Sequence, residues 1–281
     1  MKAVIPVAGL GTRLLPATKE QPKEMLPVFA RAQNGHRCLK PLVQLIFEQL
    51  YELGLREFYF IVGREKRVIE DHFTPHPNYL NILQEKGKGD LVDELRNFYL
   101  KIENSSIVWV NQPEPKGFGD AVAKVASFVS NEPILVHAGD TYVISDQNRH
   151  LKNLMKVYNE MSSDAAFVIQ RVEDPRQYGV VETEKIGEGV YKVIKAVEKP
   201  DKPPTNLAIM PIYIFRPVIF KALRETLPGA GGEIQLTDAI QKLVDWGLKV
   251  HAIELKPNDV RLDIGTVETY WQALELSYRH L

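Results

Sequence analysis

The chain is poor in cysteine and carries almost no net charge, and both shortages exclude classes of protein. Its 281 residues include a single cysteine, Cys38, which excludes an intrachain disulfide and a multi-cysteine metal site and fits a reducing compartment. A formal net charge of −1 provides no basic field for nucleic acid or for an anionic membrane surface. We therefore expect neither nucleic acid nor a membrane as a partner.

Long apolar runs are also missing. No stretch reaches the roughly 20 residues that span a bilayer, and the amino terminus enters a strand pattern without the features of a secretory signal. These observations predict a cytoplasmic protein. Hydrophobic residues at 44% and charged residues at 25% are ordinary values for a globular protein, and the length is sufficient for one large α/β domain.

The apolar pattern alternates between strand and helix through about residue 171, turns into a hairpin, and then returns to α/β. The clearest predicted strands are 2–8, 57–62, 107–110, 133–140 and 165–170, with 178–183 and 190–198 as antiparallel partners. The predicted helices are 38–53, a helical hairpin within 65–103, one helix reaching about 128, 151–161, and 267–279 at the end. This order predicts a Rossmann-like mixed, mostly parallel sheet flanked by helices, with a small antiparallel hairpin region.

The first strand runs directly into a glycine-rich, basic loop, GLGTRLLPATK at 9–19 followed by PKEMLP at 22–27. Gly9 and Gly11 permit a close backbone approach and positive φ, so that successive N–H groups converge on an anion. Arg13 and Lys23 add the two usual partners of phosphoryl oxygens. A dinucleotide fingerprint would require glycine at Leu14, and the Gly-Lys-Ser/Thr of a Walker loop is missing. An ordinary strand-to-helix turn is the simpler alternative, which the density of basic residues and prolines disfavours.

This long, ordered motif resembles the signature of the sugar-1-phosphate nucleotidyltransferases, in particular the bacterial-type group that acts on UTP and glucose 1-phosphate. The resemblance covers nearly the whole chain and implies the nucleotide-diphospho-sugar transferase fold. It also implies that the nucleotide is bound by a set of loop residues, namely Ala8, Gly9, Leu10 and Gly11.

A second strand, glycine loop and helix occur around Gln112 and Gly117. The side-chain amide of Gln112 complements the imide edge of uracil or thymine, and the glycines Gly117 and Gly119 permit close approach to a base or ribose. An ordinary loop with helix-capping glycines fits these residues equally well. The resemblance implies that Gln112 and Gly117 recognise uracil.

Two carboxylates, Asp140 and Asp263, each follow an apolar strand or loop. Ligands gather at the carboxyl ends of strands in an open α/β sheet, and a carboxylate beside phosphate requires a cation, which favours a Mg²⁺ site. Each Asp alone is also compatible with an ordinary turn. The resemblance matches both to metal ligands, although Thr141 stands where family members often carry a second acidic residue.

The sugar-facing half is predicted around VEKP at 197–200. Glu198 can accept hydrogen bonds from vicinal hydroxyls and Lys199 can neutralise a phosphate, whereas on their own they fit a solvated strand end. The resemblance implies these contacts, together with Gly179 and Asn206. It also matches GEIQLTD at 232–238, while Pro211 replaces an expected glycine.

The implied reaction transfers a uridylyl group from UTP to glucose 1-phosphate with Mg²⁺, releasing pyrophosphate. The sugar-phosphate oxygen attacks the α-phosphorus in line, Arg13 holds the β and γ phosphates and Lys23 stabilises charge at the α-phosphate. A thymidylyltransferase using dTTP and a non-catalytic regulatory subunit are the alternatives. A nicotinamide dehydrogenase is disfavoured by Leu14 and by the carboxylate pair.

One domain is expected, with a nucleotide-binding part at about 1–145, a sugar-binding part at about 146–265 and a C-terminal helix at about 266–281. We also expect a homo-oligomer, either a dimer or a tetramer. The polar, basic interruption 30–37 departs from the family and is interpreted as a surface loop or lid.

Overall fold

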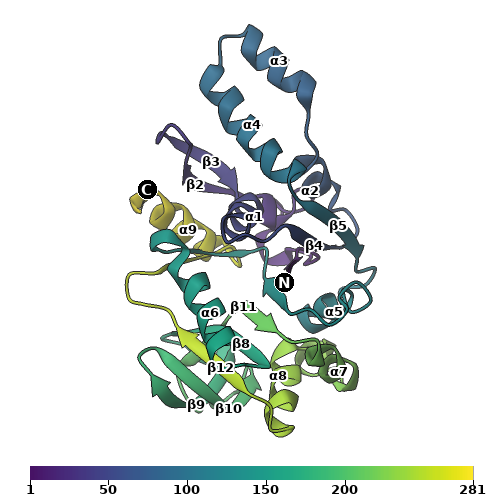
Figure 1. The fold of residues 1–281 in the computed structure, drawn as a ribbon, viewed down its shortest axis with the longest axis vertical. Helices are drawn as coiled ribbons and strands as arrows, with labels where there is room; N and C mark the ends of the chain where they lie inside the picture. The colour runs from purple at the N-terminus through teal and green to yellow at the C-terminus, as the bar shows by residue number, and fades with distance from the viewer. Residues whose placement is uncertain (281) are drawn as a thin grey trace.

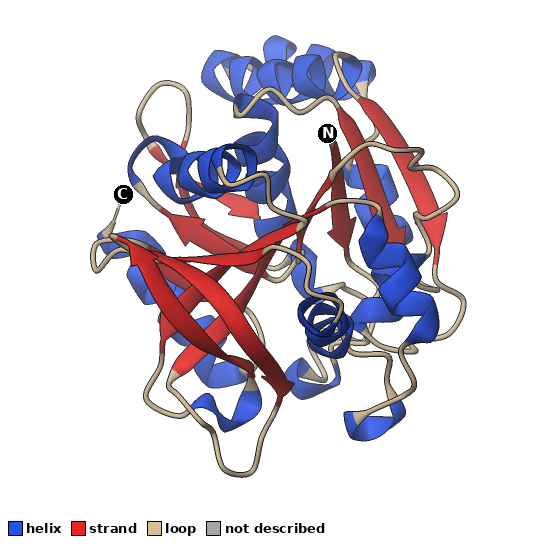
Figure 2. Cartoon of the chain, turned by 60° about the horizontal axis from the view of Figure 1, so that its bottom comes forward, coloured by secondary structure: helices blue, strands red, loops and turns tan. Residues whose placement is uncertain are grey.

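A nine-stranded mixed sheet runs through the computed structural model of the protein, which describes residues 1–280 (Figures 1 and 2). The strand order is β5-β4-β1-β6-β11-β8-β12-β10-β9. In that order the bounds are Ser106–Asn111, Glu57–Val62, Lys2–Pro6, Ile134–His137, Leu207–Phe215, Ala165–Arg171, Val250–Glu254, Val190–Glu198 and Gly179–Gly187. The predicted fold class is confirmed. No helix within residues 1–280 is long and apolar enough to cross a membrane.

Helices cover both faces of this sheet (Figure 2). They are α1 Leu42–Glu52, α2 Arg67–His72, α3 Pro77–Glu85, α4 Gly89–Glu103, α5 Phe118–Ala123, α6 Arg149–Glu160, α7 Val218–Glu225, α8 Leu236–Asp245 and α9 Val267–Arg279. Buried residues of α1, α2, α4 and α6 belong to one core, and those of α5, α7 and α8 belong to the other. In Figure 1, α3 and α4 project at the end of the molecule opposite the β9–β10 hairpin.

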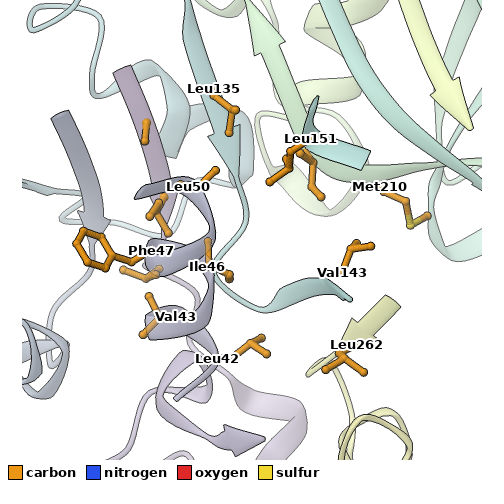
Figure 3. Close-up of a cluster of buried hydrophobic side chains, with 14 of the residues drawn as sticks. Leu42, Val43, Ile46, Phe47, Leu50, Leu135, Val143, Leu151, Met210 and Leu262 are labelled. Atoms are coloured by element: carbon orange, nitrogen blue, oxygen red, sulfur yellow. The ribbon is translucent and has the colours of Figure 1, made fainter. Parts of the chain in front are cut away.

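Side-chain alternation along the strands produces these two cores. In β1, Ala3 and Ile5 join the first core while Val4 joins the second, because successive side chains of a strand point to opposite faces. The first core includes the buried face of α1, where Phe47 is fully buried (Figure 3). The ring centroid of Phe47 lies 4.6 Å from that of Phe58. Burying each such side chain is worth roughly 1.5–3 kcal/mol, so the cores fix the positions of the strand ends.

Parallel pairing of β1 with β4 and β6 brings the carboxyl ends of these strands together. A second, two-stranded sheet lies beyond β6, where β7 (Thr141–Ile144) pairs antiparallel with β13 (Val260–Asp263). A third sheet is formed by β2 (Pro27–Arg31) and β3 (Arg37–Pro41). Figure 1 shows β2 and β3 beside α9, whose Tyr270 hydroxyl donates to the Pro27 carbonyl at 3.0 Å.

Two predicted helix boundaries are wrong. The helix expected at 38–53 begins only at Leu42, because residues 37–41 pair with β2 as strand β3. The interruption at 30–37 is therefore mostly the end of a β-hairpin rather than an irregular loop. The helix expected to reach 128 ends at Ala123 and continues as turns.

Other elements match their predictions closely. The strand at 57–62, the helical hairpin within 65–103 (α3 and α4), the antiparallel pair β9–β10 and the helix at 267–279 are confirmed. The last helix begins with a capping box in which the Thr266 side chain accepts from Thr269 N–H at 3.2 Å. Residue 281, included in the predicted C-terminal helix, lies outside the described residues.

We predict that acid destabilises the fold through His150, a buried residue near the start of α6. Burial, assisted by the neighbouring His137 and Arg149, lowers the pKa of His150 to about 3. In the unfolded chain the His150 imidazole therefore takes up a proton near pH 6.5, whereas in the folded chain it stays neutral to much lower pH. The contribution of neutral His150 to the free energy of unfolding is fully present above pH 6.5 and is lost as the pH falls towards 3. The expected loss is about 2 kcal/mol at pH 5.

Chemical unfolding of the wild type and of His150→Gln across pH 5–7.5 gives the free energy of unfolding at each pH. The slope of this free energy against pH measures the contribution of His150. We expect a shallower pH dependence for His150→Gln, whatever its stability at neutral pH. The matched control is His36→Gln, on the exposed turn between β2 and β3, which should keep the wild-type slope. Equal slopes for all three proteins would remove His150 as the cause.

Candidate active site

A cleft of about 670 Å³ opens at the carboxyl ends of β1 and β6. It collects most of the residues that the sequence singles out, from segments far apart in the chain. These are Ala8, Gly9, Leu10, Gly11, Arg13, Lys23, Gln112, Gly117, Asp140, Gly179, Glu198, Lys199 and Asp263. Asn206 is the exception, because its exposed side chain lies ahead of β11 and accepts a hydrogen bond from Arg171 at 3.2 Å.

The glycine loop after β1 is stabilised by a hydrogen bond between two of its own residues. Gly11 has a φ of +67°, a conformation that side chains with a Cβ rarely adopt. Its carbonyl accepts a hydrogen bond from the Thr18 hydroxyl at 2.8 Å. Arg13 follows in a 3₁₀ turn, Thr12–Leu14, and its guanidinium would lie 3.5 Å from a Cβ added at Gly265. The loop thus brings Arg13 to the segment that immediately follows Asp263.

Lys23 forms an ion pair with Asp140 across 117 residues of sequence. Lys23 lies in the 3₁₀ turn Lys23–Met25, which the buried Met25 anchors in the core. Burial opposes the charge on each partner, but their mutual attraction outweighs it. The pKa of Lys23 is accordingly raised and that of Asp140 is lowered. Both groups are therefore held in their charged forms at neutral pH.

Asp263 is held beside Asp140 by the small β7–β13 sheet. Thr141 and Asp263 are register partners, and Ile264 N–H donates to the Asp140 carbonyl at 2.9 Å. Burial and the negative charge of Asp140 raise the pKa of Asp263. Two neighbouring carboxylates that repel each other favour a bound cation, and oxygen ligands are those that Mg²⁺ prefers.

The two carboxylates fit a Mg²⁺ site in which the substrate and water provide the remaining ligands. Within residues 1–280, no group of three or more His, Cys, Asp or Glu side chains is arranged to hold a metal ion. Mg²⁺ commonly takes one or two carboxylates and completes its octahedron with phosphate oxygens and water. The donor set of Asp140 and Asp263 agrees with that habit.

A buried ion pair lies behind Lys23, and the sequence analysis missed it. Glu24 is 2% exposed, and its carboxylate lies 3.2 Å from the ammonium of Lys66, which is 8% exposed. Burial raises the pKa of Glu24, while Lys66 and Lys23 oppose that rise. The only signal in the sequence is the position of Glu24 next to Lys23, because nothing there indicates that residue 66 reaches it.

On the other side of the cleft, Glu198 ends strand β10 and accepts a hydrogen bond from the Thr237 hydroxyl at 2.6 Å. Lys199 follows with a φ of +40° and its ammonium 3.4 Å from the Glu198 carboxylate. Left-handed backbone at a residue other than glycine costs energy and concentrates at functional sites. Gly179 lies against this pair, because a Cβ there would be 2.5 Å from the Thr237 hydroxyl and 3.1 Å from Glu198. Thr237 belongs to the matched segment GEIQLTD at 232–238, but the sequence did not indicate its contact with Glu198.

Gln112 is nearly buried, and the protein itself uses the donor half of its amide. Its Nε2 donates to the Gly117 carbonyl at 3.2 Å and to the Asp120 carboxylate at 2.8 Å. We expected both the donor and the acceptor of this amide to face a base, but the donor is used within the protein. The amide oxygen is the part of Gln112 that can accept a hydrogen bond from the imide N–H of a pyrimidine.

Comparison with known proteins places this cleft in a family. The profile of the nucleotidyl transferase family matches residues 2–278. The UTP–glucose-1-phosphate uridylyltransferase of Bacillus subtilis is 42% identical over 274 residues, covering 95% of this chain and 89% of that protein. The enzyme of the same name from Staphylococcus epidermidis is 39% identical over 273 residues, covering 95% and 90%.

Solved structures agree with these relatives. A UDP-glucose pyrophosphorylase complexed with UDP-glucose is 35% identical, with a TM-score of 0.84 and coverage of 100% of this chain and 99% of that chain. A UTP-bound enzyme of the same kind from Acinetobacter baumannii is 31% identical, with a TM-score of 0.84 and coverage of 99% and 92%.

We predict that Gly179→Ala destabilises the protein by about 1–3 kcal/mol, the usual cost of an overpacked core position. The added methyl would lie 2.5 Å from the Thr237 hydroxyl and would push this side chain away from Glu198. Urea unfolding monitored by circular dichroism measures the change. Gly89→Ala is the control, because a Cβ at the start of α4 meets no atom within 4 Å. A Gly179→Ala protein as stable as wild type would show that the contact relaxes freely.

Proposed function

Since the chain belongs to the nucleotidyl transferase family, we infer that it transfers a uridylyl group from UTP to glucose 1-phosphate, giving UDP-glucose and pyrophosphate. The observation that supports this inference is that two groups of charged residues lie on opposite sides of one cleft. The glycine loop with Arg13 and Lys23 forms the first, and Glu198 with Lys199 forms the second. The carboxylates Asp140 and Asp263 lie in the same cleft.

The chemistry needs no covalent intermediate and no general base. An oxygen of the sugar phosphate, already ionised at neutral pH, attacks the α-phosphorus of UTP in line, and the bond to the bridging oxygen of pyrophosphate breaks. One P–O bond forms as one breaks, so the reaction is balanced. Catalysis then consists of aligning two anions and neutralising their charge.

We assign the nucleotide triphosphate to the glycine loop. Backbone N–H groups of residues 8–11 and the Arg13 guanidinium would bind the β and γ phosphates. Lys23 would stabilise the charge that develops at the α-phosphate. Its ammonium contacts Asp140, so a bound phosphate offers it a second anionic partner within the reach of a flexible side chain.

The divalent cation belongs between the two carboxylates. Asp140 and Asp263 would hold Mg²⁺, which when bound supplies charge neutralisation and orientation of phosphate oxygens. The sugar phosphate is assigned to the opposite side, where Glu198 accepts hydrogen bonds from ring hydroxyls and Lys199 neutralises the phosphate. Gly179 leaves room beside them.

The alternatives are less well supported. A thymidylyltransferase would use the same phosphate apparatus, but both relatives described above are named for UTP. A non-catalytic subunit would have no need of charged residues in the cleft, yet Arg13, Lys23, Asp140 and Asp263 all line it.

Pyrophosphate release tests the proposal directly. With magnesium present, UTP, dTTP, CTP, ATP and GTP are each paired with glucose 1-phosphate and with other sugar 1-phosphates. We expect rapid release with UTP and glucose 1-phosphate. Faster turnover with dTTP would select the thymidylyltransferase, and release with no pair from a folded, nucleotide-binding protein would select the regulatory role.

Lys23→Ala is expected to lower kcat by about a hundredfold to a thousandfold, as loss of a preorganised group at developing charge does. Lys19→Ala is the matched control, because this lysine is in the same loop but is 76% exposed. It should keep the wild-type kcat. Wild-type turnover in Lys23→Ala would remove Lys23 from the proposed role.

Asp140→Asn is expected to raise strongly the magnesium concentration needed for half-maximal activity, because an amide is a much weaker ligand than a carboxylate. Asp245→Asn, at the end of α8 and outside the cleft, should leave the magnesium titration unchanged. Superimposable titrations for Asp140→Asn and the wild type would contradict the metal assignment.

A further inference from the structure

Arg261 lies in the cleft, and the function proposed above assigns it no role. It belongs to β13, two residues before Asp263. Side chains two residues apart on a strand point to the same face, and both line the cleft.

The guanidinium of Arg261 is held by neutral groups. It donates to the Met210 sulfur at 3.1 Å and to the Tyr178 hydroxyl at 3.1 Å, and its carbon lies 5.3 Å from the centre of the Tyr178 ring. In the part of the chain that the structure describes, the guanidinium forms no ion pair with a carboxylate. A guanidinium has five N–H donors, so the two neutral contacts leave most of its capacity for an anion.

Two arginines outside the cleft have carboxylate partners instead. Arg149 pairs with the buried Asp259 at 2.7 Å, and Arg171 pairs with Glu254 at 2.9 Å. A buried or half-buried charge is costly unless it is paired. An arginine that faces the cleft with only neutral partners is therefore suited to an anionic ligand that enters the cleft.

Tyr178 connects Arg261 to the sugar side of the cleft. Its hydroxyl accepts from Arg261, and its backbone carbonyl accepts from Lys199 N–H at 3.0 Å. Lys199 is held there with a φ of +40°. Tyr178 thus links the guanidinium of Arg261 to the backbone of Lys199, and both residues line the same cleft.

We propose that Arg261 binds the phosphoryl group of the sugar 1-phosphate together with Lys199, and so positions the attacking oxygen. This inference rests on the proposed function. The sugar phosphate enters a region that already contains the carboxylates Glu198 and Asp263, so a dianion there requires more than one cation. A guanidinium fork binds two oxygens of one phosphate, which fixes its orientation as well as its position.

The test compares Arg261→Met with the wild type, because methionine fills the space beside Met210 and Tyr178 without a charge. Initial rates are measured over crossed concentrations of UTP and glucose 1-phosphate. The KM for glucose 1-phosphate is expected to rise about tenfold to a hundredfold, the loss that follows removal of a charge-assisted hydrogen bond. The KM for UTP is expected to stay within about twofold. Arg171→Met, which removes an arginine outside the cleft, should change neither constant.

Two further variants keep the result interpretable if Arg261→Met folds poorly. Arg261→Lys keeps the charge but loses the fork, and Tyr178→Phe removes only the hydroxyl that holds the guanidinium. Both should raise the KM for glucose 1-phosphate by less than Arg261→Met does. Unchanged KM values in folded Arg261→Lys and Tyr178→Phe would count against the proposal.

A competitive inhibitor that lacks the phosphate distinguishes a contact of Arg261 with the phosphate from a contact with the sugar ring. Inhibition by glucose should be equally strong in wild type and Arg261→Met if the guanidinium binds phosphate. An equal loss of glucose and glucose 1-phosphate binding would instead place Arg261 against the ring, and an equal rise in both KM values would place it on the nucleotide. Either result overturns the proposal, whereas a wild type without turnover would overturn the proposed function itself.

Discussion

The ion pair between Lys23 and Asp140 is the contact on which the site depends. It ties the loop after β1 to the end of β6, and its partners are 117 residues apart in the chain. The carboxylate Asp263 and the buried pair Glu24–Lys66 adjoin it. Lys23 lies near the carboxylates Asp140 and Glu24, and Lys66 pairs with Glu24 in turn. That balance allows several ionised groups to share a half-buried space, where any one of them alone would be expelled or neutralised.

Local sequence patterns predicted much of the fold because they depend on neighbours in the chain. The strand Glu57–Val62 and the helix Val267–Arg279 follow from apolar spacing. Residues 38–41 were misassigned because their strand conformation depends on pairing with β2, and tertiary pairing overrides a helical pattern. The early end of α5 at Ala123 has no comparable signal in the sequence.

The sequence indicated those cleft residues that belong to a local motif. It did not indicate the contacts between residues that are far apart in the chain. The glycine loop and the two aspartates were identified from the sequence and are brought together in one cleft. Lys66 and Arg261 take their roles from partners in other segments, so no local pattern marks them. Thr237 lies in a matched motif, but its partner Glu198 belongs to another segment. Asn206, a matched motif position, is not brought to the cleft but contacts Arg171.

The place of β11 in the sheet has a consequence for how the chain is made. β11 lies between β6 and β8, so Leu207–Phe215 must be inserted between strands synthesised much earlier. Until that segment leaves the ribosome, the edge of β6 has no partner on one side, and unpaired edges invite association with other chains. Contacts of such long sequence separation also slow folding. Completion of the sheet, and with it the cleft, is therefore a late event in the biogenesis of this protein.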